Sequence, residues 1–277
     1  MIVIRKVGEM TSLTEKLSDR SIGFVPTMGA LHKGHLSLVK KSSSENDVTV
    51  VSIFVNPTQF NDPKDFERYP REVEHDLDLL KQVDVDYVFL PNRTEIYPQE
   101  DKQHYELGEI SSKMEGAFRP GHFNGVASVV KRLFEIVQPK RAYFGLKDFQ
   151  QFRIIQNLNA NFNLGVDVIG CETVRDDDGL AFSSRNRLLS KEDRELALNL
   201  SKALLLMAEN STSMNHSELE DLGKHYLTNY PEIEVEYVKV VDPESFDHPS
   251  KKAEKGKRLA LLAAKVGKVR LIDNMKI

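Results

Sequence analysis

The amino-acid sequence predicts an α/β fold, in which a parallel sheet covered by helices is followed by a smaller α+β domain. Up to about residue 175, short runs rich in β-branched residues alternate with longer segments of helical periodicity, which is typical of right-handed β–α–β units. After about residue 185, two helical segments precede three apolar runs, which is typical of an α+β domain. We therefore expect an N-terminal domain at 1–175 and a C-terminal domain at 176–277.

The N-terminal domain is expected to alternate strands with helices. The clearest strand is DVTVVSIFVNP, because β-branched residues dominate it. The clearest helix is EVEHDLDLLKQV, in which Val73, Leu77 and Leu80 form an apolar stripe. Strands so connected form a parallel sheet covered on both faces. In chain order we expect strand 21–27, helix 35–46, strand 47–57, helix 72–83, strand 86–91, helix 125–137, strand 141–145, helix 148–162 and strand 166–174.

The C-terminal domain is expected to begin with two helices. The first, at 191–210, has Ser190 as a suitable N-cap and acidic residues in its first turn. The second covers HSELEDLGKHYLTNY, and KKAEKGK is expected to form a solvated turn at 251–257. The three apolar runs that complete the domain are 235–242, 258–266 and 269–275.

Composition narrows the classes of function. The 277 residues, 40% of them hydrophobic, are enough to bury a substantial core. With 38 basic and 42 acidic residues the net charge is −4, which gives no overall attraction to nucleic acid. The N-terminal segment lacks a signal-peptide pattern, and no run of about 18 apolar residues occurs, so we expect a cytoplasmic protein that binds no membrane.

The single cysteine, Cys171, excludes an internal disulfide and fits a reducing compartment. It lies in the apolar run VDVIGCETV. This setting predicts a buried core thiol and not a nucleophile.

The segment PTMGALHKGH, residues 26–35, follows the first expected strand and leads into a helix. Ligands bind beyond the carboxyl ends of parallel strands, and a helix N-terminus favours anions. Gly29 lets the backbone approach a ligand, and Gly34 allows close packing where the helix begins. His32 and His35 are then placed to donate hydrogen bonds to a phosphate group. Two surface histidines without a catalytic role, or a pair of metal ligands, are the alternatives. The strand–loop–helix setting favours the phosphate site.

Two further loops carry groups suited to a small polar substrate. In FVNPTQF, Asn56 and Gln59 supply neutral donors and acceptors at a strand end, although an ordinary polar turn would look the same. In EGAFRPGHFNGV, Arg119 can pair with a substrate carboxylate or simply with Glu115.

Two more segments carry groups suited to phosphate. In FGLKDFQQ, Lys147 follows a strand end, where a lysine can reach a nucleotide as a mobile point charge, and Asp148 can serve as an N-cap. In TVRDDDGLAFSSRN, two serines precede Arg185, whose guanidinium can bind phosphate through two hydrogen bonds. A serine-capped turn at the domain junction is the alternative.

Together these loops resemble the pantothenate synthetase family, ATP-dependent ligases that join pantoate to β-alanine. The matching stretches are PTMGALHKGH, FVNPTQF, YPREVEHD, EGAFRPGHFNGV, FGLKDFQQ, TVRDDDGLAFSSRN and RLIDN, and they extend over nearly the whole chain. The H-x-G-H element alone is shared by other nucleotidylyltransferases, whereas the combination is highly specific. The resemblance implies a Rossmann-like nucleotide-binding domain of the H-x-G-H nucleotidylyltransferase type, with the C-terminal domain acting as a lid.

The family resemblance also assigns roles to individual residues. Catalytic roles are implied for His35, as the proton donor, and for His32, Lys147 and Arg185. Gln59 is expected to bind pantoate and β-alanine, Gln151 to bind pantoate, and Asn56 and Arg119 to complete the substrate site. ATP is expected to lie along Met28, Gly29, Ala30, Leu31, His32, Lys33, Gly34, His35, Gly145, Leu146, Lys147, Asp148, Val174, Phe182, Ser183, Ser184 and Arg185. Mg²⁺ is expected with the ATP, with Asp76 as the matching acidic residue, and the chain is expected to form a homodimer.

Two positions depart from the family pattern. Phe182 stands where the family usually has Leu or Met, and His75 stands where other members often carry a carboxylate.

The implied reaction forms pantothenate, AMP and diphosphate through a pantoyl-adenylate intermediate. One alternative is a nucleotidylyltransferase that stops after adenylyl transfer and needs no amine acceptor. The other is a nucleotide-binding regulatory module, which would bind ATP without releasing diphosphate.

Overall fold

A computed structural model describes residues 1–99, 103–249 and 256–277, which form two compact units. The first unit comprises Met1–Leu146 and Gln150–Glu172. The second comprises Lys147–Phe149 and Thr173–Ile277. Each unit has its own sheet and its own core.

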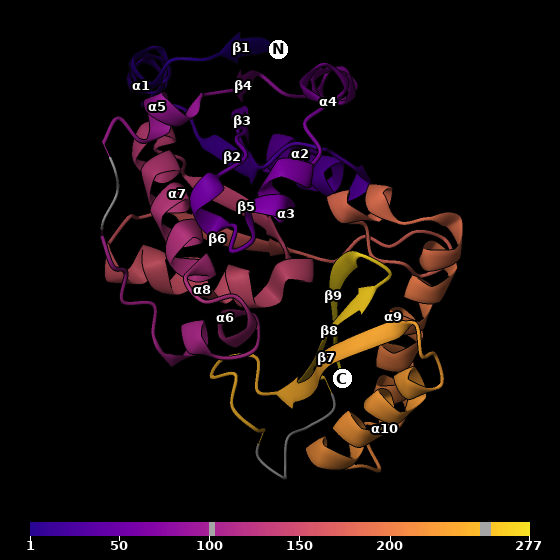
Figure 1. Cartoon of the computed structure of the whole chain (residues 1–277). Helices are drawn as coiled ribbons and strands as arrows, with labels where there is room; N and C mark the ends of the chain where they lie inside the picture. The colour runs from indigo at the N-terminus through magenta and orange to yellow at the C-terminus, as the bar shows by residue number, and fades with distance from the viewer. Residues whose placement is uncertain (100–102, 250–255) are drawn as a thin grey trace. The chain divides into compact units, whose positions relative to one another are not determined.

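The first unit is built on a parallel six-stranded sheet with the order β1-β4-β3-β2-β5-β6 (Figure 1). The two central strands, β2 and β3, are paired over their whole length, from Ile22 opposite Val48 to Thr27 opposite Ile53. All the pairings in this sheet are parallel, as predicted. The strands are β1 (Ile2–Ile4), β2 (Ile22–Thr27), β3 (Val48–Ile53), β4 (Tyr87–Phe89), β5 (Arg141–Gly145) and β6 (Asp167–Cys171).

Helices cover both faces of this sheet. On one face, Leu38 and Leu80 from two helices pack with Val51 in a buried cluster. On the other face, the rings of Phe24 and Phe134 meet edge to face at 6.3 Å. The α-helices are α1 (Val7–Lys16), α2 (Lys33–Glu45), α3 (Pro63–Arg68), α4 (Val73–Leu80), α5 (Arg93–Ile96), α6 (Glu115–Phe118), α7 (His122–Val137) and α8 (Phe149–Asn161). The short 3₁₀ turns are η1 (Pro57–Gln59), η2 (Glu109–Ser112) and η3 (Leu146–Asp148). The first residue of α8 and the last two residues of η3 belong to the second unit.

This unit differs from the sequence prediction in several places. Strand β1 and helices α1, α3, α5 and α6 were not expected, and the strand predicted at 166–174 ends at Cys171. The strand predicted at 47–57 is wrong beyond Ile53, because the chain turns there and enters η1 at Pro57, which has no N–H to continue a ladder. Helix α7 begins at His122, three residues earlier than predicted, directly after Gly121 in the left-handed region at φ +82°.

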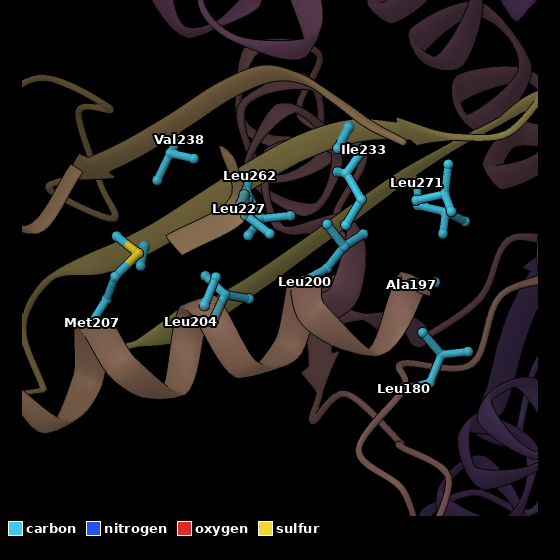
Figure 2. Packing of buried hydrophobic residues seen from close by; sticks show 14 of the residues in the cluster. Leu180, Ala197, Leu200, Leu204, Met207, Leu227, Ile233, Val238, Leu262 and Leu271 are labelled. Carbon is cyan, nitrogen blue, oxygen red and sulfur yellow. The ribbon is translucent and has the colours of Figure 1, made fainter. Parts of the chain in front are cut away.

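The second unit is a three-stranded antiparallel sheet packed on helices, as predicted for an α+β domain. Its elements are η4 (Ser184–Leu188), α9 (Lys191–Glu209), α10 (His216–Thr228), β7 (Ile233–Val241), β8 (Leu259–Val266) and β9 (Val269–Lys276). Figure 2 shows Leu200, Leu204 and Met207 of α9 pointing toward the strands that carry Val238 and Leu262. Removing one such buried leucine side chain would cost about 2–5 kcal/mol.

The predicted helix cap in the second unit is confirmed. The Ser190 side chain accepts a hydrogen bond from the backbone N–H of Asp193 at 3.0 Å, at the start of α9. The turn expected at 251–257 lies mostly outside the described residues. Among the helices that the structure describes, none has the length and apolar character needed to span a membrane.

Candidate active site

The H-x-G-H loop leaves the carboxyl end of β2 and enters α2, as the sequence predicted. Its backbone takes an unusual course, because Gly29 has φ +79° and Ala30 has φ +50°. For alanine this left-handed conformation costs about 1–2 kcal/mol. The loop is therefore held in its conformation by contacts with the rest of the unit.

The main anchor of the loop is Asp76 on α4. Its Oδ2 accepts a hydrogen bond from the backbone N–H of Ala30 at 2.8 Å, and its Oδ1 accepts one from that of Leu31 at 2.7 Å. The aspartate is 1% exposed. A Cβ atom on Gly29 would lie 2.8 Å from Oδ2, so only glycine fits between the loop and this carboxylate. Asp76 thus fixes the loop through its main chain.

The two histidines of the motif lie side by side at the start of α2. The rings of His32 and His35 stack with centroids 4.0 Å apart and planes at 28°. His32 is the N-cap residue, with extended backbone, and the first turn of α2 carries no acidic residue. No acidic side chain of α2 itself opposes an anionic ligand at the positive end of the helix dipole.

A cavity of about 290 Å³ adjoins this loop. Met28, Gly29 and Asp76 line it, together with the charged side chains of Arg71 and Arg93. The remaining residues that line it are Ile53, Phe54, Val55, Pro57, Phe66, Glu72, Val73, Leu90 and Pro91.

Gln59 lies in the turn η1 with its amide near the loop. Its Nε2 donates to Met28 Sδ at 2.8 Å, and its Oε1 accepts from Asn56 Nδ2 at 3.3 Å. The backbone of this turn packs closely against α7. A Cβ atom on Gly125 would lie 2.3 Å from the Thr58 carbonyl oxygen, so the close approach requires glycine at this position. Gln59 is thus positioned by three separate contacts.

Asn56 holds this turn in place. Its Nδ2 donates to the Gly125 carbonyl oxygen at 3.0 Å as well as to Gln59, and its Oδ1 accepts from Thr58 Oγ1 at 3.0 Å and from the Tyr97 hydroxyl at 3.2 Å. The residue is 1% exposed. Both amide protons are used inside the protein, which positions Gln59, and substrate binding by Asn56 stays a prediction.

Arg119 belongs to a buried network behind Gln59. Its guanidinium lies 3.7 Å from the Glu115 carboxylate and 3.1 Å from His122 Nε2, and it donates to the Gln59 carbonyl oxygen at 3.4 Å. His122 Nδ1 lies 2.7 Å from the same carbonyl oxygen. Since a guanidinium only donates and a carbonyl only accepts, the network assigns the proton of neutral His122 to Nδ1. Glu115, one of the two expected partners of Arg119, thus lies beside it, and pairing with a substrate carboxylate stays a prediction.

The remaining residues of the first unit lie around β5 and α8. Gly145 ends β5, Leu146 follows it, and Gln151 is half-buried near the start of α8. Cys171 is buried at the end of β6, and burial raises the pKa of its thiol to about 11, so it is a core thiol as predicted.

The second unit contains the residues that were predicted to bind phosphate. Lys147 Nζ lies 3.8 Å from Asp148 Oδ1. Val174 accepts a hydrogen bond from the Phe182 backbone N–H at 3.0 Å, so these two residues close a turn over 174–182. Ser183 caps η4, where its Oγ accepts from the Arg185 backbone N–H at 3.3 Å, and Ser184 is buried. Lys147 and Ser183 also line one small cavity of this unit.

Sequence reasoning did not find four residues that hold these groups in place. They are His122 behind Gln59, and Arg175, Asp273 and Asn274 in the second unit. The last two belong to the RLIDN motif, which was recognised without a role. The polar character of Asp273 and Asn274 at the end of an apolar strand was the available signal.

The residues present suit a Mg²⁺ ion that substrate phosphates and water would mainly hold. Within the described part of the chain, no group of three or more histidine, cysteine or acidic side chains is arranged to hold a metal. Asp76 already accepts main-chain hydrogen bonds through both oxygens. Mg²⁺ commonly binds through substrate phosphates and water with one or two carboxylates, which requires no protein cage.

Comparisons with known proteins agree with this geometry. The model of the pantoate-beta-alanine ligase family matches residues 2–276. The chain is 47% identical to the pantothenate synthetase of Pseudothermotoga lettingae, over 99% of this chain and 98% of that protein. It superimposes on the crystal structure of the enzyme of that name from Thermus thermophilus with a TM-score of 0.93 at 41% identity, covering 100% of this chain and 99% of that one. A crystal structure of pantoate-beta-alanine ligase from Francisella tularensis, complexed with beta-gamma ATP and beta-alanine, matches with a TM-score of 0.84 at 38% identity, covering 100% and 97%. The chain belongs to the pantoate-beta-alanine ligase family.

Proposed function

We propose that this chain catalyses the ATP-dependent condensation of pantoate with β-alanine, a carbon–nitrogen ligation that yields pantothenate for coenzyme A biosynthesis. The observation that carries the proposal is the H-x-G-H loop with its stacked histidines, held at the carboxyl end of β2 in a chain of this ligase family. Relatives at 47% and 48% identity are named pantothenate synthetase.

The reaction requires activation of a carboxylate, because oxide is too poor a leaving group for an amine to displace at neutral pH. A carboxylate oxygen of pantoate attacks the α-phosphorus of ATP, and the bond from that phosphorus to diphosphate breaks. The neutral amine of β-alanine then attacks the acyl carbon of pantoyl adenylate, the bond to AMP breaks, and the nitrogen loses one proton to water. The protein's task is to align these groups and to stabilise charge on the phosphates.

His32, His35 and the N-terminus of α2 supply the stabilisation in the first unit. Removing one fixed donor of this kind raises the activation free energy by about 3 kcal/mol. His35 acts as the proton donor, in line with the family resemblance.

Gln59 recognises pantoate and β-alanine. Support comes from its amide, whose Nε2 rests on a thioether sulfur, a weak acceptor that a substrate oxygen can replace at little cost. Gln151 binds pantoate, in line with the resemblance, and Arg119 acts on Gln59 through its carbonyl oxygen.

Lys147, Ser183, Ser184 and Arg185 bind the phosphates in this proposal. They belong to the second unit, whereas the histidines belong to the first. Joint action of both sets on one nucleotide, and closure of the C-terminal domain as a lid, stay predictions from the resemblance. The same holds for the other ATP-binding residues, the homodimer and the cytoplasmic location. When bound, Mg²⁺ neutralises charge on the phosphates of ATP.

The two alternatives are less well supported. A nucleotidylyltransferase that stops at adenylyl transfer would have the same loop, but the family match favours the ligase. A regulatory module would not need the elaborate positioning of Gln59 by Asn56, Gly125 and His122.

The decisive experiment is pantoate-dependent exchange of labelled diphosphate into ATP, with Mg²⁺ present and β-alanine absent. Exchange that requires pantoate is expected. If ATP binds and pantoate brings about no exchange, the adenylate step is refuted; if exchange occurs but β-alanine yields no pantothenate, the ligase assignment fails.

A further inference from the structure

The end of β9 carries two buried polar residues that the reaction does not use directly. Asp273 is 5% exposed and Asn274 is 7% exposed. A buried carboxylate or amide destabilises the protein unless hydrogen bonds compensate for its lost hydration. The partners of these two side chains therefore indicate what they do.

Asp273 binds Arg175 through two parallel hydrogen bonds. Arg175 Nη1 donates to Oδ2 at 2.6 Å, and Nη2 donates to Oδ1 at 2.9 Å. The same guanidinium donates to the carbonyl oxygens of Gly179 at 3.2 Å and Asn274 at 3.1 Å. Arg175 thus links the end of β9 to the turn over 174–182, which ends next to Ser183.

Asn274 binds the main chain of the lysine expected at the phosphates. Its Nδ2 donates to the Lys147 carbonyl oxygen at 2.7 Å, and its backbone N–H donates to Asp273 Oδ1 at 2.8 Å. Lys147 lies in a 3₁₀ turn of only three residues. So short a turn has few internal hydrogen bonds, and an external bond therefore has a large effect on the position of the lysine backbone.

These contacts converge on one place. Lys147, Ser183 and Asp273 all line the same small cavity of the second unit. Lys147 and the segment 183–185 are far apart in the sequence, and the same part of β9 supports both of them.

We propose that Asn274, Asp273 and Arg175 are positioning residues that hold Lys147 and the Ser183–Arg185 segment in register for the phosphates of ATP. This inference rests on the proposed function. It gives the RLIDN motif a role: its Asp and Asn tie the last strand to the phosphate-binding groups. Fixing the lysine backbone leaves only its side chain to be ordered when the nucleotide binds, which lowers the entropy cost of binding.

The test compares Asn274→Ala with Arg270→Gln. Positions 270 and 274 lie on the same face of β9, since side chains alternate along a strand. Arg270 pairs with Glu236 at 2.8 Å and has no contact with Lys147 among the interactions described, so the control removes a strand-to-strand interaction from the same sheet. Asn274→Asp, which keeps the shape of the side chain and removes the donor, serves if the alanine variant does not fold.

The expected result is a rise of about tenfold in the Kd for ATP, measured by calorimetry, and a similar rise in the KM for ATP in diphosphate exchange. The KM for β-alanine should stay unchanged, and Arg270→Gln should leave all three values within about twofold of the unmodified chain. In a Lys147→Ala background, Asn274→Ala should add less than a twofold effect on ATP binding, because the bond acts through Lys147.

Two outcomes would overturn the inference. One is a Kd for ATP in the Asn274 variant that equals that of the Arg270 control. The other is a full effect of Asn274→Ala on the Kd in the Lys147→Ala background. Failure of the proposed function is distinguishable, because it would appear as absent pantoate-dependent exchange in the unmodified chain. The calorimetric comparison of ATP binding would still decide the role of Asn274 in that case.

Discussion

Replacing Asp76 by asparagine tests whether the H-x-G-H loop depends on its anchor. The carboxylate accepts hydrogen bonds from the main-chain N–H groups of Ala30 and Leu31, at 2.8 and 2.7 Å, and both residues are buried. The asparagine keeps one acceptor and turns an NH₂ group toward the other N–H.

The magnitude follows from those two contacts. A hydrogen bond to a charged group contributes about 1.5–3 kcal/mol, and a buried N–H left without an acceptor costs about 1–3 kcal/mol. Release of the left-handed conformation of Ala30 returns about 1–2 kcal/mol. We therefore expect Asp76→Asn to lower the free energy of unfolding by about 2 kcal/mol. The loop should shift, and a displacement near 1 Å at the reacting groups slows chemistry on the order of 100-fold.

Urea unfolding measures the free energy of unfolding, and pantoate-dependent diphosphate exchange measures the rate of the chemistry. The control is Asp78→Asn on the same helix, whose carboxylate is exposed and pairs with Lys81. It should change exchange by less than about twofold. Titration with Mg²⁺ separates the two roles considered for Asp76: a metal ligand predicts recovery at high Mg²⁺, whereas a loop anchor predicts none.

Exchange by Asp76→Asn at the unmodified rate would refute the anchoring role. Recovery of that rate by Mg²⁺ alone would replace it with the metal-ligand role.

Three further predictions concern single side chains. His35→Ala should slow adenylate formation by about 100-fold or more with the fold intact, because a fixed donor to the phosphates is lost; single-turnover formation of pantoyl adenylate measures this, and an unimpaired rate would exclude the role. Gln59→Ala should raise the KM values for pantoate and β-alanine about tenfold and leave that for ATP unchanged, since the amide recognises the two substrates; equal effects on all three would contradict it. Burial raises the pKa of the Cys171 thiol from 9.0 to about 11, so its contribution to stability is complete below pH 9 and is lost as the pH rises toward 11. Cys171→Ser should therefore flatten the fall in unfolding free energy over that range, and the native thiol should react with iodoacetamide only after unfolding; rapid alkylation of the folded chain would show that it is not a core thiol.

Strand β1 and helix α1 show where local patterns are too weak to predict structure. Two of the three residues of β1 are exposed, so the strand lacks a buried apolar run. Helix α1 buries only Met10 and Thr14, and its other apolar side chains are Val7 and Leu13, so its apolar stripe is short and weak in the sequence. Pairing of β1 with β4 defines the strand, and that contact joins residues more than 80 positions apart.

By itself, the sequence determined the order and type of the main elements, the parallel sheet, the α+β class of the C-terminal unit and the loops expected to carry the chemistry. These follow from periodicity, β-branching and short motifs, which are properties of neighbouring residues. Only the tertiary structure decided what holds the chemical groups in place. Asp76 meets Ala30 across 46 positions, Asn56 meets Gly125 across 69, and Asn274 meets Lys147 across 127. A side-chain amide or carboxylate looks the same in sequence whether it binds a substrate, a metal or a distant main chain, and the fold selects its partner.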